Sequence, residues 1–258
     1  MVRLGQNFLA DPNLLDAILR DAALTPEDVV LEVGAGEGVL TRRLADVAAH
    51  VHAVELDRRL EEALAPIAAR PNVELHWGDA MKLDLAAFDP APTAMVANLP
   101  YSIATPLILR TIYELPSLQR WTVMVQREIA DRLRARPRTS AYGSPSVQVQ
   151  LACEVRLVRT VDAAVFVPRP RVESAVLGLR RTGPGADAAT RDVVRAAFGH
   201  RRKSLSRSLD HAQPGSLGAT RAVLSAIGLP PQARAEVLAP EHFAALAEGL
   251  EWQPRDSK

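Results

Sequence analysis

Four consecutive residues carry the clearest chemistry in the chain: Asn98, Leu99, Pro100 and Tyr101. They follow an apolar run at residues 94–97, which places them at the carboxyl end of an expected strand. The Asn98 side-chain oxygen and the Leu99 carbonyl can accept the two N–H bonds of a flat amine, and Pro100 restricts the backbone that carries this carbonyl. Tyr101 offers a ring on which a base can stack. The pattern is typical of a site that alkylates an amino group of a base.

Polar groups also follow the ends of three other expected strands. Gly34, Gly36 and Gly38 form a G-x-G-x-G turn, whereas a dinucleotide site requires G-x-G-x-x-G. Glu55 ends the next strand, 19 residues after Gly36, where a carboxylate can accept both ribose hydroxyls. Asp79 follows the third strand and is placed to meet the adenine edge of the same ligand. Each group alone is common in turns and helix caps. Three strand ends that fit one ligand favour S-adenosylmethionine over NAD.

The elements that must position these groups form an alternating series of short apolar runs and amphipathic stretches. This pattern predicts βαβ units and a parallel sheet with its ligands at the carboxyl ends of the strands. Two later runs, 153–158 and 174–180, lack a full helix between them and predict an antiparallel end to the sheet. The first five expected strands are residues 29–33, 51–55, 73–76, 94–97 and 121–125.

The pattern changes after Thr182-Gly183-Pro184-Gly185. From about residue 188 onward it is helical with short loops, which predicts a small all-α domain behind a Gly/Pro linker. The expected organisation is therefore an α/β, Rossmann-like ligand-binding domain at residues 1–182 and a small helical domain at residues 186–258.

Composition limits the classes of protein that fit this chain. Its 258 residues, 48% of them apolar, suffice for a large core. The only cysteine, Cys153, excludes an intrachain disulfide and is expected to be a small core residue. The six histidines show no ligand spacing along the sequence, so no metal is expected. No leader or long apolar span is evident, which predicts a cytoplasmic protein without a membrane partner, and nothing requires more than a monomer.

The net charge of +1 conceals a strong asymmetry. Residues 1–118 contain 9 lysines and arginines against 17 acids, whereas residues 119–209 contain 18 against 7. A basic section beside an acidic one is expected of a protein that binds a polyanion, and nucleic acid is favoured here over a merely solvated surface. The first candidates for phosphate contact are Arg201, Arg202, Lys203 and Arg207, and the second are Arg132, Arg134, Arg136 and Arg138.

Phe166 is a candidate for a second stacking face. Only 4% of the residues are aromatic, and this one precedes Pro168-Arg169-Pro170, which predicts a rigid loop. Ordinary core packing is the alternative interpretation for Phe166, as it is for Tyr101. If Phe166 and Tyr101 both stack on the base, their two rings offset the few kcal/mol needed to take the base out of its helix.

The chain resembles the ribosomal RNA adenine dimethyltransferases of the KsgA type along almost its whole length. The resemblance rests on residues 5–9 (GQNFL), 32–38 (EVGAGEG), 98–101 (NLPY), 166–174 (FVPRPRVES) and 198–203 (FGHRRK). It implies a class I methyltransferase domain with a small helical domain. It also implies dimethylation at N6 of two adjacent adenosines near the 3′ end of small-subunit (16S) rRNA, in a ribosome assembly particle, with S-adenosylhomocysteine as the second product.

The resemblance also assigns residues to the cofactor. It implies contacts from Asn7 and Leu9, which the pattern alone would assign to a turn and to the core. The other implied contacts come from the glycine loop, from the ends of the second and third strands, and from the residue between cofactor and target: Gly34, Gly36, Glu55, Asp79, the Ala80 amide and Asn98.

Three alternatives stay open at this point. The related Erm enzymes, which methylate large-subunit RNA and confer macrolide resistance, share the layout but usually have Ile at the position of Leu99; Tyr142-Gly143 and the helical carboxyl-terminal segment also favour the KsgA type. An assembly factor that only binds RNA would show a broken glycine loop or a lost Asn98, and neither is seen. A nicotinamide-dependent dehydrogenase is opposed by the glycine spacing.

Overall fold

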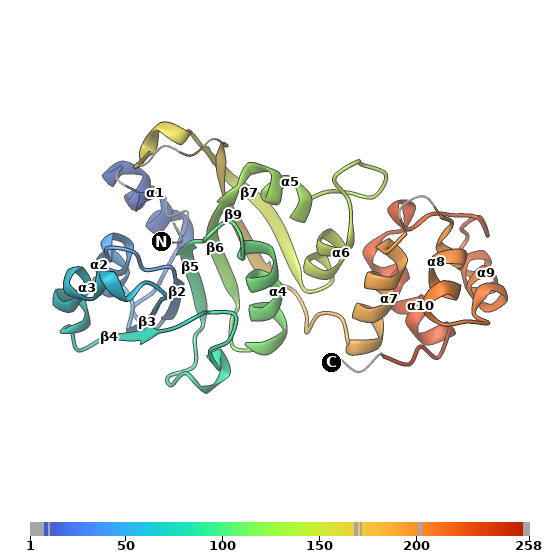
Figure 1. Cartoon of the computed structure of the whole chain (residues 1–258), viewed down its shortest axis with the longest axis horizontal. Helices are drawn as coiled ribbons and strands as arrows, with labels where there is room; N and C mark the ends of the chain where they lie inside the picture. The colour runs from blue at the N-terminus through green and yellow to red at the C-terminus, as the bar shows by residue number, and fades with distance from the viewer. Residues whose placement is uncertain (1–7, 10, 168–169, 171, 201–202, 255–258) are drawn as a thin grey trace. The chain divides into compact units, whose positions relative to one another are not determined.

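The structure is a computed structural model that describes residues 8–9, 11–167, 170, 172–200 and 203–254. The chain divides into two compact units (Figure 1). The first unit contains Met1–Ala130 and Glu154–Arg181, and the second contains Asp131–Cys153 and Thr182–Lys258.

A seven-stranded sheet forms the centre of the first unit, in the order β4-β3-β2-β5-β6-β9-β7. The first five strands in chain order pair in parallel, as the sequence predicts. Strands β9 and β7 are neighbours at the end of the sheet, but the antiparallel pairing of β9 with β6 was not predicted. Every residue of β2 is buried, as expected where helices or loops cover both faces of a parallel sheet. The strands are β2 (Val29–Val33), β3 (His50–Glu55), β4 (Val73–Trp77), β5 (Ala94–Asn98), β6 (Arg120–Gln126), β7 (Cys153–Val161) and β9 (Ser174–Arg181).

Helices cover the two faces of the sheet separately. Helices α1 (Pro12–Ala22), α2 (Val39–Ala45) and α3 (Glu61–Ala68) share one core cluster with Met124 of β6. Trp121 is three residues before Met124 and therefore points to the opposite face. Its Nε1 donates a hydrogen bond of 2.9 Å to the Thr111 hydroxyl on α4 (Ala104–Glu114), which places α4 on that face (Figure 1).

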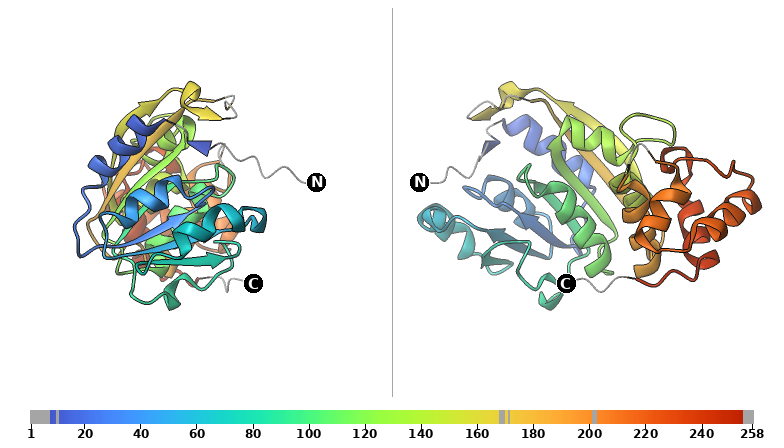
Figure 2. Two further views of the ribbon diagram at one scale, coloured as in Figure 1. Left: turned by 90° about the vertical axis from the view of Figure 1, so that its left-hand side faces the viewer. Right: turned by 45° about the vertical axis from the view of Figure 1, so that its right-hand side comes forward.

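A separate two-stranded sheet joins the beginning of the chain to a segment far along it. Strand β1 (Phe8–Leu9) pairs antiparallel with β8 (Phe166–Val167), with Leu9 opposite Phe166 (Figure 2). The sequence pattern did not predict this pairing. The remaining short elements are η1 (Arg58–Leu60), η2 (Leu85–Ala87), η3 (Ala163–Val165) and α5 (Arg127–Leu133).

The second unit is helical, as predicted from residue 188 onward. Its apolar residues, among them Leu209, Leu224 and Phe243, form one core. Its elements are α6 (Ser144–Gln150), α7 (Ala188–Phe198), α8 (Leu205–Ala212), α9 (Leu217–Ala226), η4 (Ala235–Val237) and α10 (Pro240–Gly249) (Figure 2). Residues 131–153 also pack with this unit, although they precede the predicted linker. The predicted domain boundary at residues 182–186 stays a prediction.

Buried Tyr142 ties that earlier segment into the helical core. Its hydroxyl donates a hydrogen bond of 2.9 Å to the Leu238 carbonyl, and burial raises the pKa of the phenol well above its usual range. Across the described residues, no helix combines the length and the apolar character needed to cross a membrane.

Candidate active site

The glycine loop after β2 packs against the motif that follows β5. Gly34 adopts φ +83°, and a Cβ at this position would lie 3.3 Å from the Pro100 ring and 3.6 Å from the Asn98 carbonyl oxygen. Only glycine allows both this backbone conformation and this close approach. Strands β2 and β5 are neighbours at the point where the strand order reverses, which is where ligands bind in open α/β sheets.

The amides of the glycine loop are bound by the protein itself. The amides of Gly34 and Ala35 donate to the Val54 carbonyl at 2.9 and 3.2 Å, and the Gly36 amide donates to Glu55 Oε2 at 2.8 Å. A pyrophosphate site would instead point such amides at its ligand. The loop is therefore poorly suited to a dinucleotide, which supports the interpretation of the G-x-G-x-G spacing.

Glu55 is held in one orientation at the end of β3. Its Oε1 accepts hydrogen bonds from the Leu56 and Asp57 amides at 2.9 and 2.8 Å, while Oε2 accepts the loop amide of Gly36. The residue is only 4% exposed. The contact with a ribose stays a prediction, but the carboxylate is fixed beside the loop as that prediction requires.

Glu32, inside β2, is a buried acid that the spacing analysis did not single out. Burial is the main cause that raises its pKa, to about 8, and the charge of Glu55 adds to this effect, whereas the Thr41 hydroxyl lowers it. Within the part of the chain described, its Oε2 has no hydrogen-bond partner. Its signal in the sequence is an acid inside an otherwise apolar strand. The Glu55 carboxylate beside the loop disfavours an anionic ligand, and Glu32 adds an acid that burial keeps protonated at neutral pH.

The loop after β4 places Asp79 and Ala80. Asp79 Oδ1 accepts the Met81 amide at 2.9 Å, and the side chain is 35% exposed. Arg110, on α4, donates to the carbonyls of Ala80 and Leu83 at 2.5 and 2.7 Å. Arg110 therefore fixes this loop from the neighbouring helix, a positioning role that sequence spacing could not predict.

The motif at the end of β5 is anchored on both sides. The Leu99 amide donates to the Met124 carbonyl at 3.0 Å, and Leu99 is buried. The Tyr101 hydroxyl lies 2.7 Å from the hydroxyl of Ser174, a fully buried residue at the start of β9. Asn98 is partly exposed at the strand end. The structure thus brings the predicted acceptors and the predicted stacking ring together at the sheet edge that carries the glycine loop.

The structure places Phe166 in the core of the first unit. Its side chain is 2% exposed and belongs to the cluster formed with α1, α2 and α3. This is the packing that the alternative interpretation expects, and the stacking role stays a prediction. Leu9 pairs with Phe166 through the backbone, and Asn7 lies outside the described residues.

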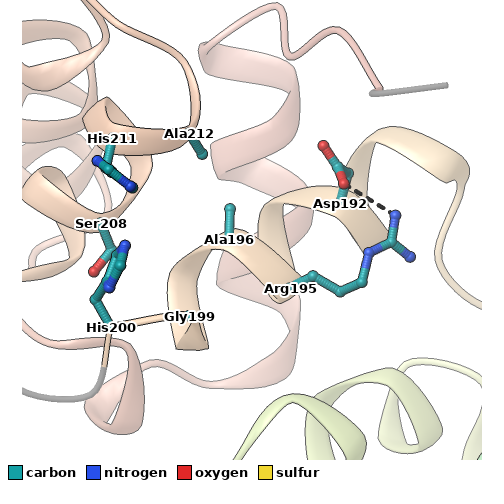
Figure 3. A pocket seen from close by; sticks show the side chains of 8 residues that line it. All are labelled: Asp192, Arg195, Ala196, Gly199, His200, Ser208, His211 and Ala212. Carbon is teal, nitrogen blue, oxygen red and sulfur yellow. Dashed lines mark hydrogen bonds and ion pairs between the residues drawn. The ribbon is translucent and has the colours of Figure 1, made fainter. Parts of the chain in front are cut away.

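Two of the four first-choice phosphate contacts are described, and both are exposed, as are all four second-choice arginines, Arg132, Arg134, Arg136 and Arg138. Lys203 precedes α8 and Arg207 lies on it, whereas Arg201 and Arg202 fall outside the described residues. Residues of α7 and α8, with Gly199 and His200 after α7, line a pocket of about 340 Å³ in the second unit (Figure 3).

Charged and aromatic side chains line this pocket. The His200 and His211 rings meet edge to face at 4.7 Å between centroids, and Arg195 pairs with Asp192 at 3.0 Å. Desolvation, with the charges of Lys203 and His211, lowers the pKa of His200. The pocket and the exposed cations next to its lining in the chain, Lys203 and Arg207, suit an anionic ligand.

Comparison with known sequences places the chain among rRNA-modifying proteins. It matches the family "Ribosomal RNA adenine dimethylase" over residues 2–251. It is 45% identical to "Ribosomal RNA small subunit methyltransferase A" of Rubrobacter xylanophilus, with 95% of this chain and 92% of that protein covered. It is 43% identical to the protein of the same name from Thermobifida fusca, with 95% and 88% covered.

Solved structures show the same architecture. A dimethyladenosine transferase from Plasmodium falciparum superposes with a TM-score of 0.76 at 25% identity, covering 93% of this chain and 95% of that one. The 23S rRNA methyltransferase ErmE superposes with a TM-score of 0.69 at 31% identity, covering 95% and 100%. Both similarities therefore extend over nearly the whole chain, beyond the sheet that carries the glycine loop.

Proposed function

This chain belongs to the ribosomal RNA adenine dimethylase family, and we propose that it methylates N6 of two adjacent adenosines near the 3′ end of 16S rRNA, with S-adenosylmethionine as methyl donor. The chain is an rRNA adenine dimethyltransferase. Its identity to proteins named for the small subunit, 43–45%, exceeds its 31% identity to ErmE. This difference supports the small-subunit RNA over the large-subunit RNA as substrate. We place the reaction in a cytoplasmic ribosome assembly particle, with the enzyme acting as a monomer.

One observation carries the proposal. The close approach of Gly34 to the Pro100 ring and the Asn98 backbone carbonyl brings the glycine loop next to the segment that carries the two proposed amine acceptors. A methyl donor held by the loop and an amine held by the motif are then neighbours. Positioning of this kind can supply a large part of a rate enhancement.

The residues around the loop fit S-adenosylmethionine, which carries a positive charge. Glu55 holds a carboxylate beside the loop, and the amides of Gly34, Ala35 and Gly36 are already bound, so the site favours a cation over an anion. When bound, S-adenosylmethionine supplies an electrophilic methyl group and leaves as S-adenosylhomocysteine. Glu55 and Asp79 would hold its ribose and its adenine. Family resemblance adds Asn7, Leu9, Gly34, Gly36, Ala80 and Asn98.

The motif after β5 acts on the amine. The lone pair of adenine N6 is delocalised into the ring, so the amine is a poor nucleophile. The Asn98 side-chain oxygen and the Leu99 carbonyl accept its two N–H bonds and hold the lone pair toward the methyl group, and Pro100 keeps the carbonyl aimed. The alkylated nitrogen is acidic and loses its proton to water, so no dedicated base is needed. Tyr101 stacks on the base, and Phe166 takes the other face only if its ring leaves the core.

Methyl transfer to ribosomal particles tests the proposal. Small-subunit particles that lack the modification are incubated with the enzyme and labelled S-adenosylmethionine, and the RNA is digested to nucleosides. We expect labelled dimethyladenosine from these particles and no label in particles already modified. Label in protein-free large-subunit RNA, with none in the particles, would replace the small-subunit assignment by the Erm-type one. No label in either would leave RNA binding as the function.

A further inference from the structure

Three histidines and one glutamate meet on β3 and β4, away from the glycine loop. His52 of β3 lies opposite Glu74 of β4 in the parallel register. His50 is two residues before His52 and His76 is two residues after Glu74, so all four side chains lie on the same face of the sheet. Glu74 Oε2 lies 3.6 Å from His52 Nδ1 and 3.8 Å from His50 Nε2. On the other side, His76 Nε2 lies 3.8 Å from Glu74 Oε1 and 3.0 Å from His52 Nδ1.

These separations match the edges of a zinc coordination sphere. Zn²⁺ binds imidazole nitrogen and carboxylate oxygen at about 2.0–2.2 Å, so neighbouring ligands in a tetrahedral site are roughly 3.3–3.5 Å apart. The donor atoms of His50, His52 and Glu74 all lie within 4.8 Å of one another. The Glu74 oxygen, 3.6 and 3.8 Å from the two histidine nitrogens, needs only a small shift to join them on such a sphere.

The hydrogen bonds of His52 fix which of its nitrogens can bind a metal. Its Nε2 lies 2.8 Å from the Pro90 carbonyl, which can only accept, so Nε2 carries the proton. The Nδ1 lone pair therefore accepts the Nε2–H of His76 at 3.0 Å, a hydrogen bond that a metal on Nδ1 would replace. Metal-binding histidines commonly donate their second N–H to a carbonyl in this way.

The other two ligands are His50, which has an unpartnered ring nitrogen among the described residues, and Glu74, which is open to solvent. The buried Nε2 of His50 has no hydrogen-bond partner in the described part of the chain. The Glu74 side chain is 52% exposed, so an ion can reach the cluster from solvent. Its negative charge adds the attraction that imidazoles alone do not provide.

We propose that His50, His52 and Glu74 bind a divalent transition metal of the zinc class, with His76 available as a fourth donor. The metal joins β3 to β4, which is the edge strand of the sheet. His52 precedes Glu55 by three residues, roughly 10 Å along a strand, so the ion stabilises the fold and takes no part in methyl transfer.

Metal titration of the full chain tests the site. The protein is stripped with a chelator, dialysed and titrated with Zn²⁺ by calorimetry and thermal denaturation, and with Co²⁺ by visible absorption. We expect one ion per chain, a visible Co²⁺ spectrum with nitrogen ligands, and a rise in Tm of roughly 5–10 °C when free zinc exceeds the Kd about 100-fold. Methyl transfer by the stripped protein should equal that of the loaded protein.

Two variants on the accessible side of the cluster decide the assignment. His50→Gln and Glu74→Gln leave buried His52 in place, and each should weaken zinc binding roughly 10- to 100-fold or more. His211→Gln and Glu62→Gln change the same residue types outside the cluster and should bind zinc like the wild type. Circular dichroism before titration confirms that all four variants are folded. Absence of binding to the wild type, or equal binding by the cluster variants and their controls, would overturn the proposal.

Discussion

The glycine-loop site in the first unit and the pocket in the second hold their polar groups in different ways. At the glycine loop, Glu55 is 4% exposed and accepts three backbone amides. In the pocket, Arg195 is 53% exposed and pairs with an acid three residues away on its own helix. The first arrangement fixes geometry, whereas the second presents charge to solvent.

This difference predicts a division of labour. A buried group bound by the main chain keeps its position, so a change there alters the chemical step and is insensitive to salt. Exposed cations are screened by salt and contribute little to stability, but together they attract a polyanion. Variants at the glycine-loop site should therefore change turnover or stability, and variants of the exposed cations Lys203 and Arg207 should change RNA affinity.

The largest effect is expected for Asn98→Ala. The substitution removes the side-chain acceptor for the amine but leaves β5 and the glycine loop intact. Loss of one such fixed hydrogen bond typically costs roughly 100- to 1000-fold in kcat. Single-turnover methyl transfer and S-adenosylmethionine binding by calorimetry separate the chemical step from folding and cofactor affinity.

The control for this variant is Ser102→Ala. Ser102 is exposed just beyond the motif, and its hydroxyl is not required by the proposed contacts. Wild-type turnover by Asn98→Ala would remove this residue from the site. A loss in Ser102→Ala as large as that in Asn98→Ala would show that any change near the motif is sufficient.

The next largest effect concerns Glu32 and pH. Its pKa in the folded protein is raised to about 8 from an ordinary value near 4.5, so between these values the folded state holds a proton that the unfolded state has lost. Stability must therefore fall as pH rises through this window. The fall amounts to about 3 kcal/mol between pH 5 and pH 7.

Glu32→Gln removes this titration. Urea denaturation at several pH values should show the variant gaining on the wild type as pH rises from 5 to 8, while exposed Glu27→Gln follows the wild-type curve. Parallel curves for wild type and Glu32→Gln would mean that the acid is ionised in the folded protein.

The effect of an added methyl group on stability should differ between Gly38 in the first unit and Gly218 in the second. A Cβ on Gly38 would lie 2.0 Å from Ile67 Cδ1 and 3.0 Å from Leu64 Cδ2, and φ is +75°. A Cβ on Gly218 of α9 would have no described atom within 4 Å. Gly38→Ala should lower the free energy of unfolding by about 1–3 kcal/mol, and Gly218→Ala should raise it by about 0.5 kcal/mol. Chemical denaturation checks both signs, and a neutral Gly38→Ala would mean that α3 moves away at little cost.

The sequence predicted the parallel part of the sheet nearly residue by residue. Buried parallel strands are continuous apolar runs between turn residues, so residues 29–33 and 94–97 were visible without a structure. The positions of Asn98 and Glu55 at strand ends followed from the same signal. These are local properties of the chain, and a pattern can report them.

Contacts that depend on long-range pairing could not be predicted. The histidines show no ligand spacing along the chain because the cluster depends on the parallel register of His52 with Glu74. The burial of Phe166 depends on core packing and on the pairing of β8 with β1. Tyr101 reaches Ser174 across 73 residues. In each case the partner is chosen by tertiary packing, which no local pattern records.

The smallest effect is expected for the exposed cations of the second unit. Lys203→Ala and Arg207→Ala each remove one charge from the candidate phosphate contacts, so the slope of log affinity against log salt should decrease by about 1. Between 50 and 200 mM salt this corresponds to roughly a threefold change in RNA affinity per residue, with kcat at saturating RNA unchanged.

The matched control is Arg221→Ala, which changes an exposed arginine on α9. It should keep the wild-type slope if RNA contact is confined to the surface around Lys203 and Arg207. Equal slopes for all three variants would mean that the charge of the unit acts as a whole, whereas a loss of kcat in Lys203→Ala would show that the second unit also fixes the geometry of the reacting base.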